Sequence, residues 1–141
     1  MTNEERQLLL SELCARLPYK VKVQYTDPED NRLNIDVADG VNIDEPKGMP
    51  TVDVFQYSIP IDKIKLCLRP MSQMTSVDHI IYQQKMKVIQ DVDRTLHWCQ
   101  TPESIDWLHA YHYDNRGLIE KGLAVPIREW SIAGYKKGGQ L

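Results

Sequence analysis

The start of the chain has the spacing of an amphipathic helix. Its apolar residues recur every three or four positions and therefore share one face, which consists of Leu9, Leu10, Leu13 and Cys14. Thr2 and Glu5 have the spacing of a capping box, in which two side chains satisfy free backbone donors at a helix start. Pro18 cannot continue a helix. The pattern predicts a helix over about residues 3 to 16.

After residue 20 the apolar period changes to two, which is typical of strands with one buried face. The apolar positions of the first strand are Val21, Val23 and Tyr25, and those of the second are Leu33, Ile35 and Val37. Residues 27–31 between them are rich in turn formers, so the two strands are predicted to form a hairpin. Residues 39–50 contain two glycines and two prolines and are expected to form a loop. Alternation resumes over residues 52–57 and again over residues 63–69.

Helical spacing returns after Pro70. Thr75 or Ser76 can cap a helix that runs to about Arg94, and its apolar stripe contains Val77, Ile81, Val88 and Val92. Thr101 and Pro102 predict the start of another helix, and a short last helix is expected over residues 117–122.

Together these elements predict an α+β fold. It has an N-terminal helix, a small antiparallel sheet of three to four strands or a partly open barrel, and C-terminal helices packed on the apolar face of the sheet. One compact domain is expected over residues 1–135, followed by a frayed tail at residues 136–141.

Composition narrows the classes of protein. The chain has 141 residues, of which 42% are hydrophobic and 26% charged, and this excludes collagen-like and low-complexity classes. The formal net charge of −3 argues against bulk electrostatic binding to nucleic acid. The polar N-terminus, the lack of a span-length apolar run and three cysteines without a C-x-x-C pair predict a cytoplasmic protein that does not enter a membrane.

The segment from residue 97 to residue 116 carries the candidate chemistry. His109 and His112 share a helical face with Asp106, and this spacing permits a metal site, which would make the chain a metal-assisted hydrolase. The alternative is that these histidines flank an aromatic packing surface made by Trp98, Trp107, Tyr111 and Tyr113. The sequence predicts no catalytic, cofactor-binding or metal-ligating residue. It predicts instead a polar and aromatic interaction surface made by Trp107, His109, Tyr111, His112, Asp114 and Arg116.

A nucleic-acid alternative uses the same region. Two C-terminal helices joined by residues 114–117 would imitate a helix-turn-helix, with Arg116 and Lys121 meeting phosphate. The density of basic residues is low for that function, and helices packed back onto the sheet explain the pattern better.

Two blocks of sequence carry a resemblance. Leu-Arg-Pro-Met-Ser-Gln-Met-Thr at residues 68–75, and the run from Trp107 to Ala124 that includes Arg-Gly-Leu-Ile-Glu-Lys-Gly-Leu-Ala, resemble an uncharacterised protein family of Bacteroides-group gut bacteria and their phages or prophages. The resemblance covers most of residues 5–124. It implies a mobile-element context and transfers no catalytic residue.

The leading hypothesis is a small cytoplasmic phage- or prophage-type accessory or protein-interaction module without catalysis. Its expected partner is another protein or a second copy of the chain in a homodimer. The alternatives are a nucleic-acid-associated regulator that uses the C-terminal helices, and a metal-assisted hydrolase around His109 and His112.

Overall fold

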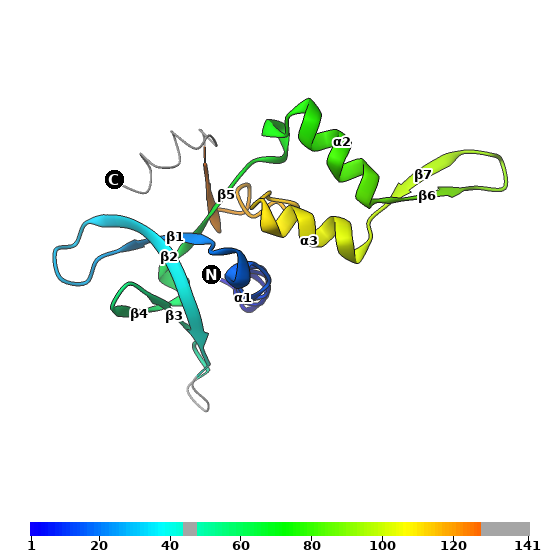
Figure 1. Ribbon diagram of the computed structural model, residues 1–141. Helices are drawn as coiled ribbons and strands as arrows, with labels where there is room; N and C mark the ends of the chain where they lie inside the picture. The colour runs from blue at the N-terminus through cyan, green and yellow to red at the C-terminus, as the bar shows by residue number, and fades with distance from the viewer. Residues whose placement is uncertain (44–47, 128–141) are drawn as a thin grey trace.

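The computed structural model describes residues 1–43 and 48–127, and these form an α+β structure (Figure 1). The first helix, α1 (Asn3–Arg16), agrees with the sequence prediction. Thr2 and Glu5 form the predicted capping box, in which the Glu5 backbone N–H donates to the Thr2 hydroxyl at 3.1 Å. A 3-10 turn over Leu17–Tyr19, with Pro18 near its start, follows the helix.

The main sheet has six strands in the order β4-β3-β2-β1-β5-β8. The strands are β1 (Lys22–Thr26), β2 (Leu33–Asn42), β3 (Thr51–Val54), β4 (Tyr57–Pro60), β5 (Lys65–Leu68) and β8 (Ala124–Pro126). All neighbouring strands are antiparallel except β5 and β8, which are parallel.

The prediction of three to four strands was therefore wrong in number. The segment 52–57 is not one strand, because the chain turns at Phe55 and Gln56, where Phe55 has a φ of 55°. β2 also continues to Asn42, through residues that were expected to form a loop. β8 forms one edge of the sheet and was not predicted, because a strand of three residues is too short to show an alternation of apolar and polar positions.

The apolar side chains of β1 and those of β2 lie on opposite faces of the sheet. Val23 pairs with Asp36 and Tyr25 pairs with Asn34, so the register places polar residues of β2 beside the buried residues of β1. The Tyr25 hydroxyl donates to the Asp36 carboxylate at 2.7 Å, which satisfies this polar pair. Leu33 and Ile35 consequently lie exposed on the outer face.

The inner face of the sheet packs against α1. Leu9 and Leu13 of α1 belong to one buried cluster with residues of β1, β2, β3, β4 and β5, together with Leu118 and Leu123. The segment 117–122 is a series of turns and not the predicted helix, and both Gly117 and Gly122 have a positive φ. The prediction that C-terminal helices cover the sheet is thus corrected, because α1 and these turns cover it.

The remaining helices build a second, smaller core. They are α2 (Ser76–Lys85) and α3 (Pro102–Ala110), and their buried cluster is Tyr82, Trp107, Leu108 and Tyr113. Helix α2 ends at Lys85, nine residues before its predicted end near Arg94. The chain then forms the strands β6 (Lys87–Gln90) and β7 (Leu96–Cys99), which within residues 1–43 and 48–127 pair only with each other.

The β6–β7 hairpin projects away from the rest of the molecule (Figure 1). It leaves the structure at the ends of α2 and α3 that lie farthest from the main sheet. No helix within the described residues is long and apolar enough to cross a membrane. The predicted tail at residues 136–141, and the end of the predicted domain at residue 135, lie outside the described residues.

Candidate interaction surface

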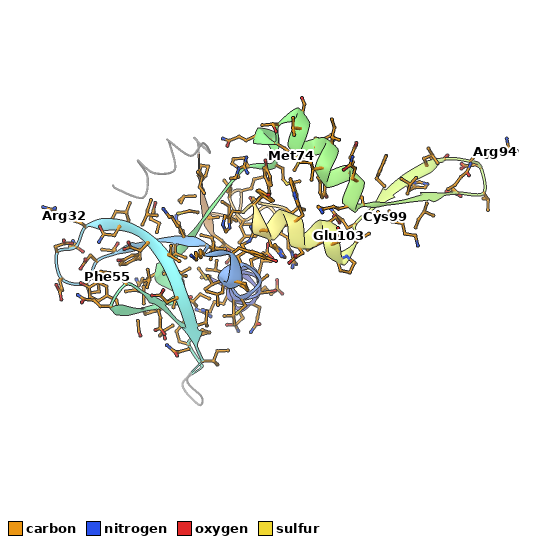
Figure 2. The ribbon with its side chains drawn as sticks, viewed as in Figure 1. Arg32, Phe55, Met74, Arg94, Cys99 and Glu103 are labelled. Atoms are coloured by element: carbon orange, nitrogen blue, oxygen red, sulfur yellow. The ribbon has the colours of Figure 1, made fainter. Side chains whose placement is uncertain are left out.

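The hairpin formed by β6, β7 and the turn between them, residues 87–99, is called the arm below. Its tip is closed by backbone hydrogen bonds between Asp91 and Thr95 and between Arg94 and Asp91, both 2.9 Å long. Arg94 has a φ of 69°, which reverses the chain there. Arg94 marks the tip in Figure 2 and Cys99 the base. The arm is therefore a defined ribbon and not an irregular loop.

The base of the arm is fixed by contacts between α2 and α3. The Thr101 hydroxyl donates to the Lys85 carbonyl at 2.6 Å, and the Lys85 ammonium lies 3.1 Å from a Glu103 carboxylate oxygen. The Gln100 side-chain amide donates to the Tyr82 hydroxyl. These contacts hold the residues just before β6 and just after β7, so the two strands leave the helices from anchored positions.

An aromatic stack stabilises this base from within. The Trp107 ring lies 5.8 Å from the Tyr82 ring and 5.8 Å from the Tyr113 ring, in both cases nearly parallel. Tyr111 lies 4.9 Å from Trp107 on the outer side. Stacked aromatic pairs stabilise a cluster beyond the apolar area that they bury. The arm is consequently mounted on a packed support.

The two faces of the arm differ in chemistry. Val88 pairs with Trp98, and Gln90 pairs with Leu96, so these four side chains share one face. The opposite face carries the pairs Lys87 with Cys99 and Ile89 with His97. The face that contains Val88, Leu96 and Trp98 is called the apolar face below.

The apolar face is open to solvent. Trp98 is 51% exposed, Leu96 62% and Val88 43%, and Val92 at the tip is fully exposed. Of the fifteen large hydrophobic side chains that are exposed among the described residues, ten lie between residues 71 and 111. Contiguous exposed apolar surface is typical of sites that bind other macromolecules. This part of the chain is therefore the strongest candidate for an interaction surface.

A buried polar junction joins the arm's support to α1. The Arg16 side chain is fully buried, and its Nη2 donates to the Tyr113 carbonyl at 2.7 Å and contacts Glu12 at 3.3 Å. Glu12 Oε2 also lies 3.5 Å from Nε2 of His109 on α3. Farther out, the Tyr19 hydroxyl donates to Asp106 at 2.5 Å. These contacts fix α3 relative to the body of the protein.

Electrostatics within this junction are coupled. Burial raises the pKa of the Glu12 carboxyl, but the neighbouring His109 and Arg16 outweigh this effect and hold the pKa below its ordinary value. Burial also lowers the pKa of the Arg16 guanidinium, against the opposing effect of Glu12. The Glu12–Arg16 pair lies within α1, and the removal of either partner would leave the other charge buried without its counterion. The contacts of Arg16 with the Tyr113 carbonyl and of Glu12 with His109 connect this pair to α3 and the segment that follows it.

The six residues of the predicted surface have separate structural roles. Trp107 is buried in the aromatic stack, while Tyr111 beside it is 46% exposed. His109 faces Glu12 in the junction. Arg116 is exposed, and lines a groove along α1 together with Asn3, Glu4, Gln7, Leu8 and Ser11. The structure therefore brings Trp107 and Tyr111 together and places Arg116 elsewhere.

The last two residues of that set are buried. His112 adopts a left-handed backbone conformation with a φ of 61°. Its burial, together with the charges of Arg16 and Arg69, lowers its pKa to about 4. Asp114 accepts hydrogen bonds from the backbone N–H groups of Leu118 and Ile119 at 2.8 and 3.0 Å. It thereby fixes the turns that cover the sheet.

Metal chemistry gains no support from this geometry. His109 contacts Glu12, whereas His112 lies among buried groups near Arg16 and Arg69. In residues 1–43 and 48–127 no group of three or more His, Cys, Asp or Glu side chains is placed to hold a metal ion.

The sequence analysis did not predict the arm, which carries the exposed apolar face of the structure. Val88 and Val92 continue the helical spacing of α2 and were assigned to its stripe. A signal was present, because Val88 and Ile89 are β-branched residues, and the turn formers Asp91 and Asp93 follow them. No protein-family model, curated protein or solved structure matches the chain, so its function is inferred from its own residues.

Proposed function

We propose that the chain is a non-catalytic protein-interaction module of phage or prophage type, and that the arm is its binding element. The observation that carries this proposal is the exposure of Val88, Leu96 and Trp98 on one face of a ribbon that projects from a packed support. Tryptophan is enriched among the residues that dominate binding energies at interfaces.

The arrangement supports binding better than catalysis or nucleic-acid recognition. The helix-turn-helix alternative needs a helix over residues 117–122, and that segment consists of turns. The arm itself carries Asp91 and Asp93 at its tip, where a phosphate-binding element would carry cations. An exposed apolar face on a packed support suits a protein surface, because the support is already ordered before binding.

The proposal is tested by affinity capture with the full chain and an arm variant. The variant L96T/W98T removes two side chains of the apolar face and keeps residues that favour strands. The matched control V77T/I80T removes two exposed apolar side chains of α2, outside the arm. Tagged protein is incubated with lysate of a Bacteroides-group gut bacterium, the host that the resemblance implies, to which untagged chain has been added.

The expected result is one or more bound proteins, either host proteins or the untagged chain itself, that are retained by the wild type and the control and lost by L96T/W98T. Identical sets for all three proteins would contradict the proposal, as would the absence of any specifically bound protein.

A further inference from the structure

The two faces of the main sheet differ in their cover. The inner face packs against α1 and the turns of residues 117–122. On the outer face Leu33 is 65% exposed and Ile35 44% exposed. When one face of an antiparallel sheet meets solvent, that face normally carries polar side chains. The large apolar residues of β2 therefore indicate that a further surface packs on the outer face.

The pairing of the strands defines the outer face. Residues that pair directly share a face, and side chains along one strand alternate between the two faces. Ile35 pairs with Gln24, which in turn pairs with Lys65. Cys67, two positions after Lys65, pairs with Val125 of β8. The apolar side chains of the outer face, on β2, β5 and β8, are Leu33, Ile35, Val37, Cys67 and Val125. Cys67 is only 5% exposed, so the open part of this face lies over β2.

The chain leaves the sheet at the edge of this same face. β8 is the edge strand beside β5 (Figure 1), and the Ile127 N–H donates to the Leu68 carbonyl at 2.8 Å. The fourteen residues that follow, 128–141, are called the C-terminal segment below. β8 and β2 are three strand spacings apart, or about 14 Å. Fourteen residues span about 45 Å when extended and about 20 Å as a helix, so the segment can reach β2 in either conformation.

The sequence of the C-terminal segment suits an apolar face. Trp130, Ile132 and Tyr135 lie within six consecutive positions. Aromatic and branched side chains of this size gain most from burial against another apolar surface. The segment therefore contains the apolar side chains that the open part of the outer face lacks as a cover.

Charge indicates the direction in which the segment crosses the face. The turn of residues 27–32 lies next to Leu33 and carries three acidic residues and one arginine, a net charge of −2. Lys136 and Lys137 directly follow Tyr135. A segment that runs from β8 to the Leu33 end of β2 brings these two cations to the acidic turn.

We propose that the C-terminal segment packs across the outer face of the sheet from β8 to β2 and covers Leu33 and Ile35. The attachment of the segment to β8 favours it over a second copy or another protein, because a short tether gives an effective concentration on the order of millimolar. The inference does not rest on the proposed function, since the arm takes no part in it.

Nuclear Overhauser contacts in the full chain test the occupant directly. With labelled methyl groups, the Trp130 indole, the Ile132 methyl groups or both should show contacts to the methyl groups of Leu33 or Ile35. An isotope-filtered measurement on mixed labelled and unlabelled chains detects only contacts between chains, and it should show none of these. The absence of all such contacts would overturn the inference, as would contacts that occur only between chains.

Thiol labelling measures how well the segment covers the face. Ile35→Cys places a thiol on β2, and mass spectrometry of peptides distinguishes it from the native cysteines. A maleimide should label position 35 at least about tenfold faster when W130S/I132S is also present. The matched control is Val77→Cys on α2, which is 66% exposed in the wild type and should label equally fast in both backgrounds. Equal rates at position 35 in both backgrounds would overturn the inference.

A charge variant tests the direction of the segment without removing any apolar side chain. K136E/K137E places like charges beside the acidic turn, so the thiol at position 35 should label about threefold faster at low salt. The difference should shrink at about 0.5 M salt, which screens exposed charges. A labelling rate that K136E/K137E leaves unchanged at low salt would overturn the proposed direction.

Discussion

The aromatic stack that supports the arm gives a prediction of large effect. Trp107 is 7% exposed and contacts the rings of Tyr82, Tyr111 and Tyr113. A tryptophan buries about 200 Å² of surface, which at about 25 cal/mol per Å² corresponds to about 5 kcal/mol. The full value is an upper limit, because the alanine that replaces Trp107 still buries part of that area. Trp107→Ala should therefore lower the free energy of unfolding by about 3 to 5 kcal/mol.

Urea denaturation followed by far-ultraviolet circular dichroism measures this loss. The matched control is Ile80→Ala, at an exposed position of α2, and it should change the free energy of unfolding by no more than about 0.5 kcal/mol. A loss below about 1 kcal/mol for Trp107→Ala would refute the reasoning. It would mean that the stack is not a packed core, and that the arm has no rigid support.

Three further predictions concern the buried polar groups. Arg16→Met leaves the Glu12 carboxylate buried without its cation and should cost about 3 to 5 kcal/mol in urea denaturation, whereas the double variant E12Q/R16M should cost less than the sum of the two single changes. The pKa of His112 is about 4 in the folded chain and 6.5 when unperturbed, so the unfolded chain binds an extra proton between those values. The free energy of unfolding should therefore fall by up to about 3 kcal/mol as the pH is lowered from 6.5 to 4. His112→Asn should remove that fall, because asparagine tolerates the left-handed backbone and does not titrate in this range. A pH dependence that is the same in the variant and the wild type would contradict this prediction. Asp114→Ala unpairs two backbone N–H groups and should cost about 1 to 2 kcal/mol by thermal or urea denaturation, with Asp114→Asn intermediate between alanine and wild type.

The sequence predicted correctly those elements that depend on residues within a few positions of each other. Thr2, Glu5 and Pro18 determine where α1 begins and where it gives way to a 3-10 turn, and the structure confirms the capping box residue by residue. The alternation of Val21, Val23 and Tyr25 likewise places a buried face on β1. These features depend on neighbours within a few positions, so one sequence contains enough information to predict them.

The alternation of apolar and polar residues does not determine which face of the sheet the apolar side chains of β2 occupy. A period of two shows that Leu33 and Ile35 share a side, but the register with β1 decides which side of the sheet that is. The turn sets this register through the hydrogen bond from the Asp27 N–H to the Arg32 carbonyl. A polar pair, Tyr25 with Asp36, could then be buried inside the sheet because its hydrogen bond is satisfied.

The interaction surface predicted from the sequence and the exposed apolar face of the structure involve different residues. Trp107 and Tyr111 were singled out for their chemistry, and they belong to the support of the arm. Trp98, which lies on the exposed apolar face of the arm, was grouped with Trp107 in one aromatic packing surface. Exposure is a tertiary property, so the sequence pattern did not separate the two tryptophans.

Hydrogen–deuterium exchange of the arm tests the central claim most directly. If a bound protein covers the apolar face, the backbone amides of β6 and β7 that pair across the ribbon should exchange more slowly once the proteins retained by the wild type in the capture experiment are added, while those of β1 and β2 should not change. In L96T/W98T the arm should exchange at the same rate with and without those proteins. Arm amides of the wild type whose exchange those proteins do not slow would contradict the account.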